Sequence, residues 1–262
     1  AVLVSPSNGG WAFLDDTLSW TSGGGVVNGY KLYISSDDTI DEDDFIIDQT
    51  TTTYKLSDLQ TLVIEYGHTY YWKVVPYNEN GPAEGCPVWS FKTPTTTQLA
   101  ESFEGTSFPP VGWSNPGGWT ASTSQYKHGT KSAYKSGSTS TQYILSTPKV
   151  TITSTSTLDF WALCSTTTGT LQIVYSPDRT TWTQVGSITF AATYTWYHYV
   201  IDLSGLAGNN FYLGFRTGLQ SASFYVDCVF GPEITPEVPG PVTLTSPSDL
   251  ATGVNEFTTF TW

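Results

Sequence analysis

Methionine is absent from all 262 residues of this chain, position 1 included, so we expect an N-terminus that is processed or internal to a longer protein. Cysteine is nearly absent, and the three that occur are Cys86, Cys164 and Cys228. An odd number at these spacings excludes a disulfide-stapled scaffold and a zinc knuckle. Cys164 and Cys228 fall on separate strands of one predicted domain, which leaves a bond between them and three free thiols as open alternatives.

Basic residues are few, since 10 Lys and Arg stand against 23 Asp and Glu, for a formal net charge of −13. This balance argues against nucleic acid and anionic membranes as partners and leaves room for divalent cations. No apolar run is long enough to cross a bilayer, and we recognise no signal-peptide pattern in the given residues. Charged residues make up only 13% of the chain, which is low for a cytosolic protein.

Histidine, the usual general base of enzymes, occurs three times, at His68, His128 and His198. None lies near a serine or cysteine in a nucleophile-elbow pattern, and no pair has the helical spacing of a metal site. We therefore expect no enzymatic activity and interpret all three as ordinary strand and turn residues.

Sustained 3.6-residue periodicity is also missing, which excludes a helical fold. In its place are alternating runs of β-branched and aromatic residues, separated by Gly, Pro, Asn and Asp. This pattern predicts an all-β protein built from sandwiches. Residues 1–94 carry 13 acidic residues against 4 lysines, whereas residues 95–231 carry 6 acidic and 6 basic residues, so two distinct domains are expected.

Seven runs of this kind divide residues 1–94. They lie near residues 2–5, 17–21, 29–35, 44–48, 52–56, 69–77 and 88–93. The sequences SPSNG, LSW, GYKLYIS, YGHTYYWKVVPYNENG and VWSFKT resemble a bacterial extracellular fibronectin type III domain, which is an Ig-like sandwich. By that resemblance Tyr70 forms the tyrosine corner, a hydrogen bond that stabilises the fold.

A second predicted domain occupies residues 99–231, after a linker at residues 95–98. The order of its motifs resembles the cleaved-adhesin or choice-of-anchor J family, which is related to MAM domains. The motifs are, in order, ESFEGTSFPPVGW, HGTKSAY, YILSTPKV, LDFWALC, LQIVYSPDRTTWTQV, WYHYVIDLSGLAG, FYLGFRT and FYVDCVFGP. The resemblance implies a secreted, non-catalytic jelly-roll β-sandwich. Within it, SPDRTTWT matches an Asp-box hairpin, in which Asp178 bonds the turn amides above Trp182.

The chain ends by repeating its own beginning. A Pro-rich linker at residues 232–241 precedes residues 242–262, which align with residues 1–20 from the Ser-Pro pair to the final Trp. Two strands alone are marginal in water, so we interpret 242–262 as the first strands of a further, incomplete fibronectin type III-like domain. Either a longer parent chain completes this domain, which is the interpretation we prefer, or its strands pack on another copy of the chain.

Carboxylates at two places suggest calcium, which binds about six to eight oxygens. The resemblance places Glu104 after the first jelly-roll strand and Asp227 in the last, where family members carry paired acids. Since Cys228 stands where the second acid is expected, Glu101 is the substitute, and we predict calcium bound by Glu104, Asp227 and Glu101. The acidic run at residues 37–48 lacks EF-hand spacing, so it is either a calcium loop or, the interpretation we favour, a solvated loop.

Glycan binding is the main competing prediction for the second domain. Jelly-rolls often bind sugars through exposed aromatic rings, and Trp113, Trp119 and Tyr126 lie in its irregular early region. These rings either stack on a glycan or fill the core of the sandwich, and the core is the interpretation we favour.

Together these features predict a non-catalytic extracellular module at the cell surface. We expect a structural or adhesive part of a modular, repetitive protein that forms a filament or a surface layer. Its expected partners are other copies of itself or other surface proteins, and not nucleic acid or a membrane. The alternative is a glycan-binding accessory segment of a secreted hydrolase or peptidase.

Overall fold

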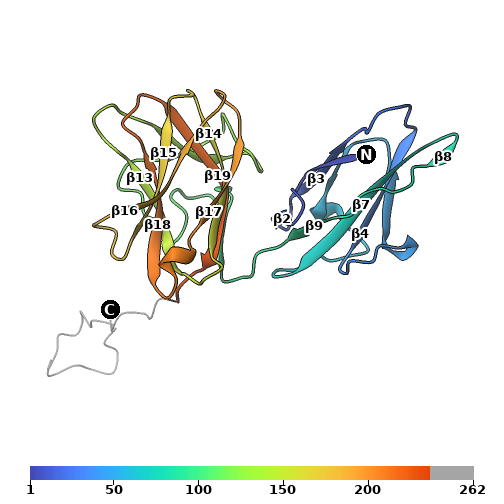
Figure 1. Cartoon of the computed structure of the whole chain (residues 1–262), viewed down its shortest axis with the longest axis horizontal. Helices are drawn as coiled ribbons and strands as arrows, with labels where there is room; N and C mark the ends of the chain where they lie inside the picture. Colours follow the sequence, from blue (N-terminus) through green and yellow to red (C-terminus); the bar gives the residue numbers. More distant parts are fainter. Residues whose placement is uncertain (237–262) are drawn as a thin grey trace, which may run out of the picture.

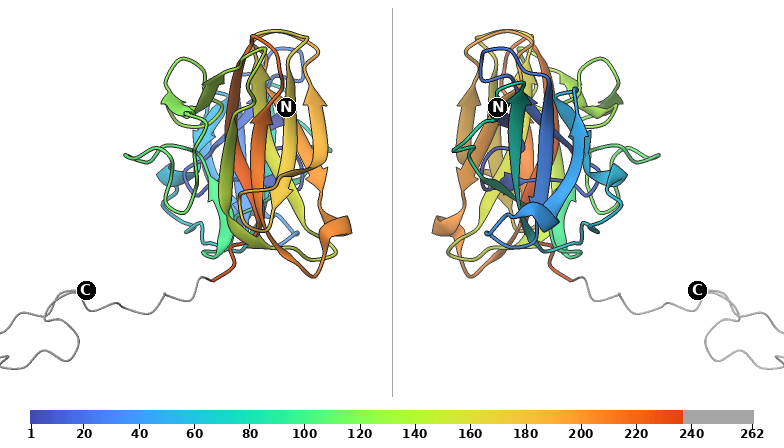
Figure 2. Two further views of the ribbon diagram at one scale, coloured as in Figure 1. Left: turned by 90° about the vertical axis from the view of Figure 1, so that its left-hand side faces the viewer. Right: turned by 90° about the vertical axis from the view of Figure 1, so that its right-hand side faces the viewer.

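The computed structural model describes residues 1–236, and the predicted third unit at residues 242–262 lies outside the described residues. The described chain is built from β-strands with three short 3-10 helices, which confirms the all-β prediction. Two β-sandwiches stand side by side, joined by the short connection between β9 (Trp89–Lys92) and β10 (Gln98–Glu101) (Figure 1). In end-on views the second sandwich lies directly behind or in front of the first (Figure 2).

The first sandwich has a three-stranded sheet in the order β1-β3-β6. Its six-stranded sheet follows the order β2-β9-β7-β4-β5, and β8 pairs with β7. The pair β2–β9 is parallel and the other pairs are antiparallel. The elements are β1 (Val2–Ser5), β2 (Gly10–Trp11), β3 (Thr17–Thr21), β4 (Gly29–Ser35), η1 (Glu42–Asp44), β5 (Phe45–Gln49), β6 (Thr53–Lys55), η2 (Leu56–Asp58), β7 (Thr69–Asn78), β8 (Gly81–Pro82) and β9.

Alternation along β7 builds the core of this sandwich. Tyr70, Trp72 and Val74 are buried on one face of the strand, as the sequence predicts, because successive strand residues point to opposite faces. The Tyr70 hydroxyl donates to the Val63 carbonyl at 3.2 Å and accepts from the Glu65 N–H at 2.9 Å. This is the hydrogen bond that the tyrosine-corner prediction requires.

The second sandwich pairs a six-stranded sheet with a four-stranded one. The first follows the order β11-β12-β19-β14-β17, with β10 paired to β19, and the second follows β13-β18-β15-β16. Strand pairing begins at Gln98 and continues to Glu233, so it extends past the predicted bounds of 99–231 at both ends. The elements are β10, β11 (Thr120–Ser122), β12 (Ser132–Ser136), β13 (Ile144–Thr151), β14 (Thr157–Cys164), β15 (Thr170–Ser176), β16 (Thr183–Thr189), β17 (Tyr197–Asp202), η3 (Ser204–Leu206), β18 (Asn210–Thr217) and β19 (Ser223–Glu233).

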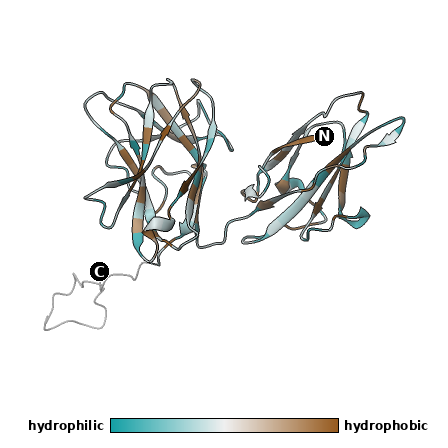
Figure 3. Ribbon diagram, viewed as in Figure 1, coloured by the Kyte–Doolittle hydropathy of each residue, from teal (hydrophilic) through white to brown (hydrophobic). Residues whose placement is uncertain are grey.

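Trp113 and Trp119 belong to the core of the second sandwich, where they are 8% and 1% exposed. This is the core interpretation favoured from the sequence, and a ring enclosed by core side chains offers no face on which a glycan can stack. Apolar residues on the strands of both sandwiches are coloured brown in Figure 3. The two cores share no residue, so each sandwich buries its own apolar face.

Two local predictions on the second sandwich have clear outcomes. Asp178 accepts the N–H groups of Thr180 at 2.8 Å and Thr181 at 3.3 Å, as the Asp-box pattern predicts. These bonds lower the pKa of the Asp178 carboxyl to about 2. Cys164 and Cys228 are both free thiols, so of the two alternatives left open for them the free thiols are correct.

No helix in residues 1–236 is both long and apolar enough to cross a membrane.

Candidate functional site: the cleft between the sandwiches

The two sandwiches meet through aromatic rings that follow a glycine turn in the first. Gly9, at a φ of 73°, takes the left-handed conformation that glycine adopts without strain and directs the chain into β2. The Trp11 ring then stacks on Phe230 of β19 at a centroid distance of 5.7 Å and an interplanar angle of 15°. Phe13 packs on the same Phe230 ring at 4.6 Å. This aromatic contact is continuous with a polar one.

His128 joins the sandwiches from the opposite side of the contact. Its side chain is only 9% exposed, and its ring lies 4.8 Å from that of Phe13. Its Nε2 is 3.5 Å from Asp15 Oδ1 and 3.4 Å from Asp16 Oδ1. Burial raises the pKa of Asp16, while the nearby His128 and the N–H of Phe13, which donates to Asp16 Oδ2 at 2.8 Å, act in the opposite direction.

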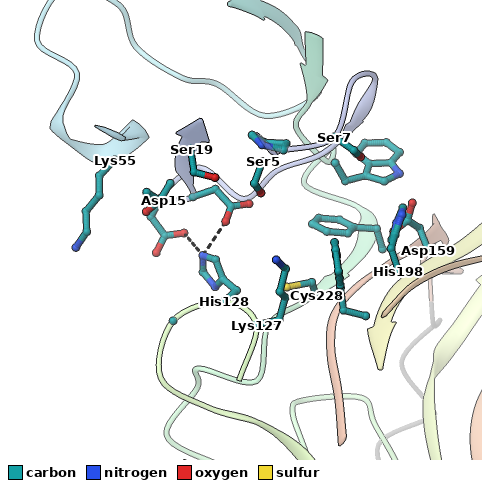
Figure 4. A pocket seen from close by; sticks show the side chains of 17 residues that line it. Ser5, Ser7, Asp15, Ser19, Lys55, Lys127, His128, Asp159, His198 and Cys228 are labelled. Atoms are coloured by element: carbon teal, nitrogen blue, oxygen red, sulfur yellow. Dashed lines mark hydrogen bonds and ion pairs between the residues drawn. The ribbon is translucent and has the colours of Figure 1, made fainter. Parts of the chain in front are cut away.

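Beside this joint lies a cavity of about 460 Å³ that is lined by both sandwiches (Figure 4). Its walls carry hydroxyls, carboxylates, ammonium groups and aromatic rings. The first sandwich contributes Ser5, Ser7, Trp11, Asp15, Asp16, Ser19 and Lys55 among others, and the second contributes Lys127, His128, Asp159, Trp161, His198, Cys228 and Phe230. Sites at domain interfaces with a few polar groups among apolar ones are a common setting for ligand binding.

Trp161, on β14, lines the wall that the second sandwich provides. The His198 ring of the neighbouring strand β17 stacks on it at 5.1 Å and 27°, and the two residues are direct cross-strand partners. Asp159 Oδ1 lies 2.7 Å from His198 Nε2 and fixes the direction of the imidazole. Above the indole ring sits the Lys127 ammonium, 4.1 Å from the ring centroid.

The sequence analysis did not identify the residues of this wall as site residues, although the alternation of buried positions along β14 pointed to them. Leu158, Phe160 and Ala162 are fully buried in the core, so the residues between them belong to the other face of the strand. That face carries Asp159 and Trp161, a carboxylate and an indole that a simple core strand does not need.

Asp227 holds the loop that carries Lys127 and His128. Its Oδ2 accepts the N–H groups of Lys127 at 2.7 Å and His128 at 3.0 Å, and its Oδ1 accepts the N–H of Cys228 at 2.7 Å. Complete burial raises the pKa of the Asp227 carboxyl to about 7, and the three N–H donors offset part of that rise. Burial likewise raises the pKa of the adjacent Cys228 thiol.

Glu104 holds the other end of the same loop. It accepts the N–H groups of Thr130 at 2.9 Å and Lys131 at 2.7 Å, together with the Thr130 hydroxyl at 2.9 Å. Burial alone would raise the pKa of Glu104, but these hydrogen bonds outweigh it and the pKa lies below the usual value. The pKa of Glu101 is raised, chiefly by burial and in part by the charge of Glu104.

These placements bear on the calcium prediction without deciding it. Asp227 and Glu104 clamp the two ends of one loop through its backbone, and no three His, Cys, Asp or Glu side chains within residues 1–236 are arranged to hold a metal ion. In the acidic run at residues 37–48, Asp41 caps the helix η1 by accepting the Asp43 N–H at 2.8 Å. Calcium at Glu104, Asp227 and Glu101 stays a prediction.

Tyr126, the third predicted glycan-stacking residue, is 47% exposed on the loop before Lys127. It does not line the cavity between the sandwiches. The sequence therefore placed a candidate ring close to the cleft but on a different surface.

Comparisons with known proteins give a likeness of fold. No protein-family model and no curated protein sequence matches the chain. Among solved structures, a carbohydrate-binding module of the β-sandwich superfamily is 15% identical and covers 89% of this chain and 97% of its own, with a TM-score of 0.44. The K2 cleaved adhesin domain of Lys-gingipain is 15% identical over 51% of this chain and 98% of its own, with a TM-score of 0.41.

A third similar structure is the CBM22-1 xylan-binding domain of Paenibacillus barcinonensis Xyn10C. It is 16% identical over 53% of this chain and 95% of its own, with a TM-score of 0.40. At such identities and scores the likeness carries no information about ligands, so the function has to be argued from the residues of the chain itself.

Proposed function

We propose that this chain is a non-catalytic structural and adhesive segment of an extracellular modular protein. The observation that carries the proposal is the joint, where Trp11 and Phe13 pack on Phe230 and His128 faces Asp15 and Asp16. An aromatic contact with an adjoining partly buried polar contact resists bending far better than a bare linker does. Two sandwiches fixed in this way transmit force and present a defined surface.

Two features support a fibronectin type III-like identity for the first sandwich. Its sheets have the strand orders β1-β3-β6 and β9-β7-β4-β5, and the Tyr70 hydroxyl bonds the backbone at Val63 and Glu65. A jelly-roll of the cleaved-adhesin type is the corresponding proposal for the second sandwich. Fibronectin-like modules set the distance and direction between binding modules, which suits the proposed role.

The histidines have positional roles that agree with a non-enzymatic segment. His128 contacts carboxylates of the other sandwich, and His198 is tied to Asp159. The whole chain should hydrolyse no peptide, ester or glycoside substrate above the buffer background. Turnover that disappears in the His198→Ala variant would overturn the proposal.

Extracellular display can be tested directly on source cells. An antibody raised against residues 1–236 should label intact cells or their secreted filaments, and protease treatment of intact cells should remove the label. Labelling that requires permeabilised cells would contradict the proposal.

Carbohydrate binding is the second candidate function. The observation that favours it is the cleft, which combines aromatic rings with hydroxyl, carboxylate and ammonium groups from two sandwiches. A sugar offers apolar C–H faces together with hydroxyls that both donate and accept, so it matches such a lining. Binding of the whole chain to an immobilised glycan panel tests this candidate.

A further inference from the structure

We propose that the wall of the cleft around Trp161 is a carbohydrate subsite that takes a short neutral oligosaccharide. The inference rests on the second candidate function and adds the place, the residues and the charge of the ligand. Trp161 lies half-buried in a cavity of about 460 Å³, within the range of about 300–1,000 Å³ that is usual for ligand pockets.

The indole ring of Trp161 is held in place before any ligand arrives. His198 stacks on it at 5.1 Å, and Asp159, itself 9% exposed, fixes His198 through the 2.7 Å contact between Oδ1 and Nε2. A platform held by neighbours loses little freedom when a ligand binds, which is the condition for useful affinity in an open cleft.

The Lys127 side chain covers one face of the Trp161 ring and can be displaced from it. Its ammonium sits 4.1 Å above the ring centroid, and its side chain is exposed and makes no hydrogen bond or salt bridge within residues 1–236. An exposed cation–π contact is weak, so a sugar ring can displace the ammonium and present its C–H face to the indole. The displaced ammonium is then positioned to donate to hydroxyls of the ligand.

The charges around the cleft select a neutral ligand over an anionic one. Asp15 and Asp16 line the wall of the first sandwich and Asp159 lines that of the second, while Lys55 and Lys127 are the lysines of the lining. A polyanionic sugar would face three carboxylates and a chain of formal net charge −13. Neutral hydroxyls can bond donors and acceptors alike, and Ser5, Ser7 and Ser19 add hydroxyls from the first sandwich.

The test begins with the whole chain on a panel of neutral and acidic glycans, followed by calorimetry with the strongest neutral binder. Trp161→Ala should weaken binding at least about tenfold, since the aromatic platform is lost. Lys127→Met keeps the length of an exposed side chain and should weaken binding about threefold to tenfold, because one hydrogen bond to the ligand is lost. Tyr126→Ala, an exposed ring outside the cavity, is the matched control and should leave affinity unchanged.

The outcomes separate the subsite from the function on which it rests. If the unmodified chain binds no glycan, both the carbohydrate candidate and the subsite are rejected. If it binds but Trp161→Ala and Lys127→Met bind equally well, only the subsite is rejected. Loss of binding in Tyr126→Ala alone would move the site to the ring that the sequence suggested, and a preference for acidic glycans would overturn the inferred charge. Retained melting temperature in Lys127→Met excludes misfolding as the cause of a loss.

Discussion

Phe13 and Phe230 lie with their ring centroids 4.6 Å apart, one from each sandwich, at the centre of the contact that joins them. Between them they link the turn after β2 to the final strand of the second sandwich. The same Phe13 ring also packs on His128 at 4.8 Å, so a single side chain contacts both the apolar and the polar parts of the joint.

Removing this ring should loosen the joint without unfolding either sandwich. We expect Phe13→Ala to reduce the coupling between the two sandwiches by about 1–3 kcal/mol, because it removes a half-buried aromatic side chain. Small-angle X-ray scattering should then show a larger maximum dimension and a less compact particle. Phe45→Ala, which removes a ring that packs on Tyr33 within the first sandwich, is the control. Scattering curves that stay the same in both variants would contradict a fixed joint.

Asp227 predicts an unusual dependence of stability on pH. Burial raises its pKa from 3.8 to about 7, so the folded protein binds this proton more tightly than the unfolded chain does. The stabilisation from protonated Asp227 is therefore fully present below the pKa of this carboxyl in the unfolded chain. It is lost as the pH rises through about 7, which lowers the free energy of unfolding by on the order of 4 kcal/mol at most. Urea midpoints of the chelator-treated protein between about pH 4 and 8 measure the slope.

The comparison variant is Asp227→Asn. It should lower stability overall, because an amide NH₂ cannot accept hydrogen bonds from the backbone N–H groups. It should also flatten the slope of stability against pH, because the titrating group is gone. Asp58→Asn removes an exposed carboxylate of the first sandwich and should leave the slope as it is. A slope of the same size in Asp227→Asn would mean that another group causes it.

The calcium prediction has a separate test. If Glu104, Asp227 and Glu101 share an ion, a chelator should lower the melting temperature of the whole chain by about 2–4 °C for each kcal/mol of binding energy. Asp227→Ala should abolish that response. A melting temperature that the chelator does not change would reject the ion and leave the hydrogen bonds to the loop at residues 127–131 as the role of these carboxylates.

Tyr70 should stabilise the first sandwich through its hydroxyl rather than its ring. Tyr70→Phe keeps the ring but removes the bonds to the Val63 carbonyl and the Glu65 N–H, so we expect a loss of about 1–3 kcal/mol in the free energy of unfolding. Tyr71→Phe, at the next position of β7 and on the opposite face, is the control and should cost much less. If urea denaturation shows the same loss of unfolding free energy in Tyr70→Phe and Tyr71→Phe, the hydrogen bonds of the Tyr70 hydroxyl do not stabilise the sandwich more than the Tyr71 hydroxyl does.

Strand positions followed from the sequence because alternation and turn residues are local signals. The predicted runs at residues 2–5, 17–21 and 29–35 match β1, β3 and β4 residue for residue. The two-residue strands β2 and β8 escaped prediction, since two residues are too few to display alternation. The resemblance to a fibronectin type III domain implied the bond of Tyr70, and the Asp-box match implied that of Asp178; each residue bonds backbone only a few residues away.

The sequence by itself determined an all-β chain, its strands and its turn chemistry. Only the tertiary structure decided that Trp113 and Trp119 are core, since irregular segments have no periodicity that separates inward from outward rings. It also decided that His128 of the second sandwich contacts Asp15 and Asp16 of the first. The cleft beside that contact exists because two surfaces that are distant in sequence pack together, and no local pattern of residues encodes such packing.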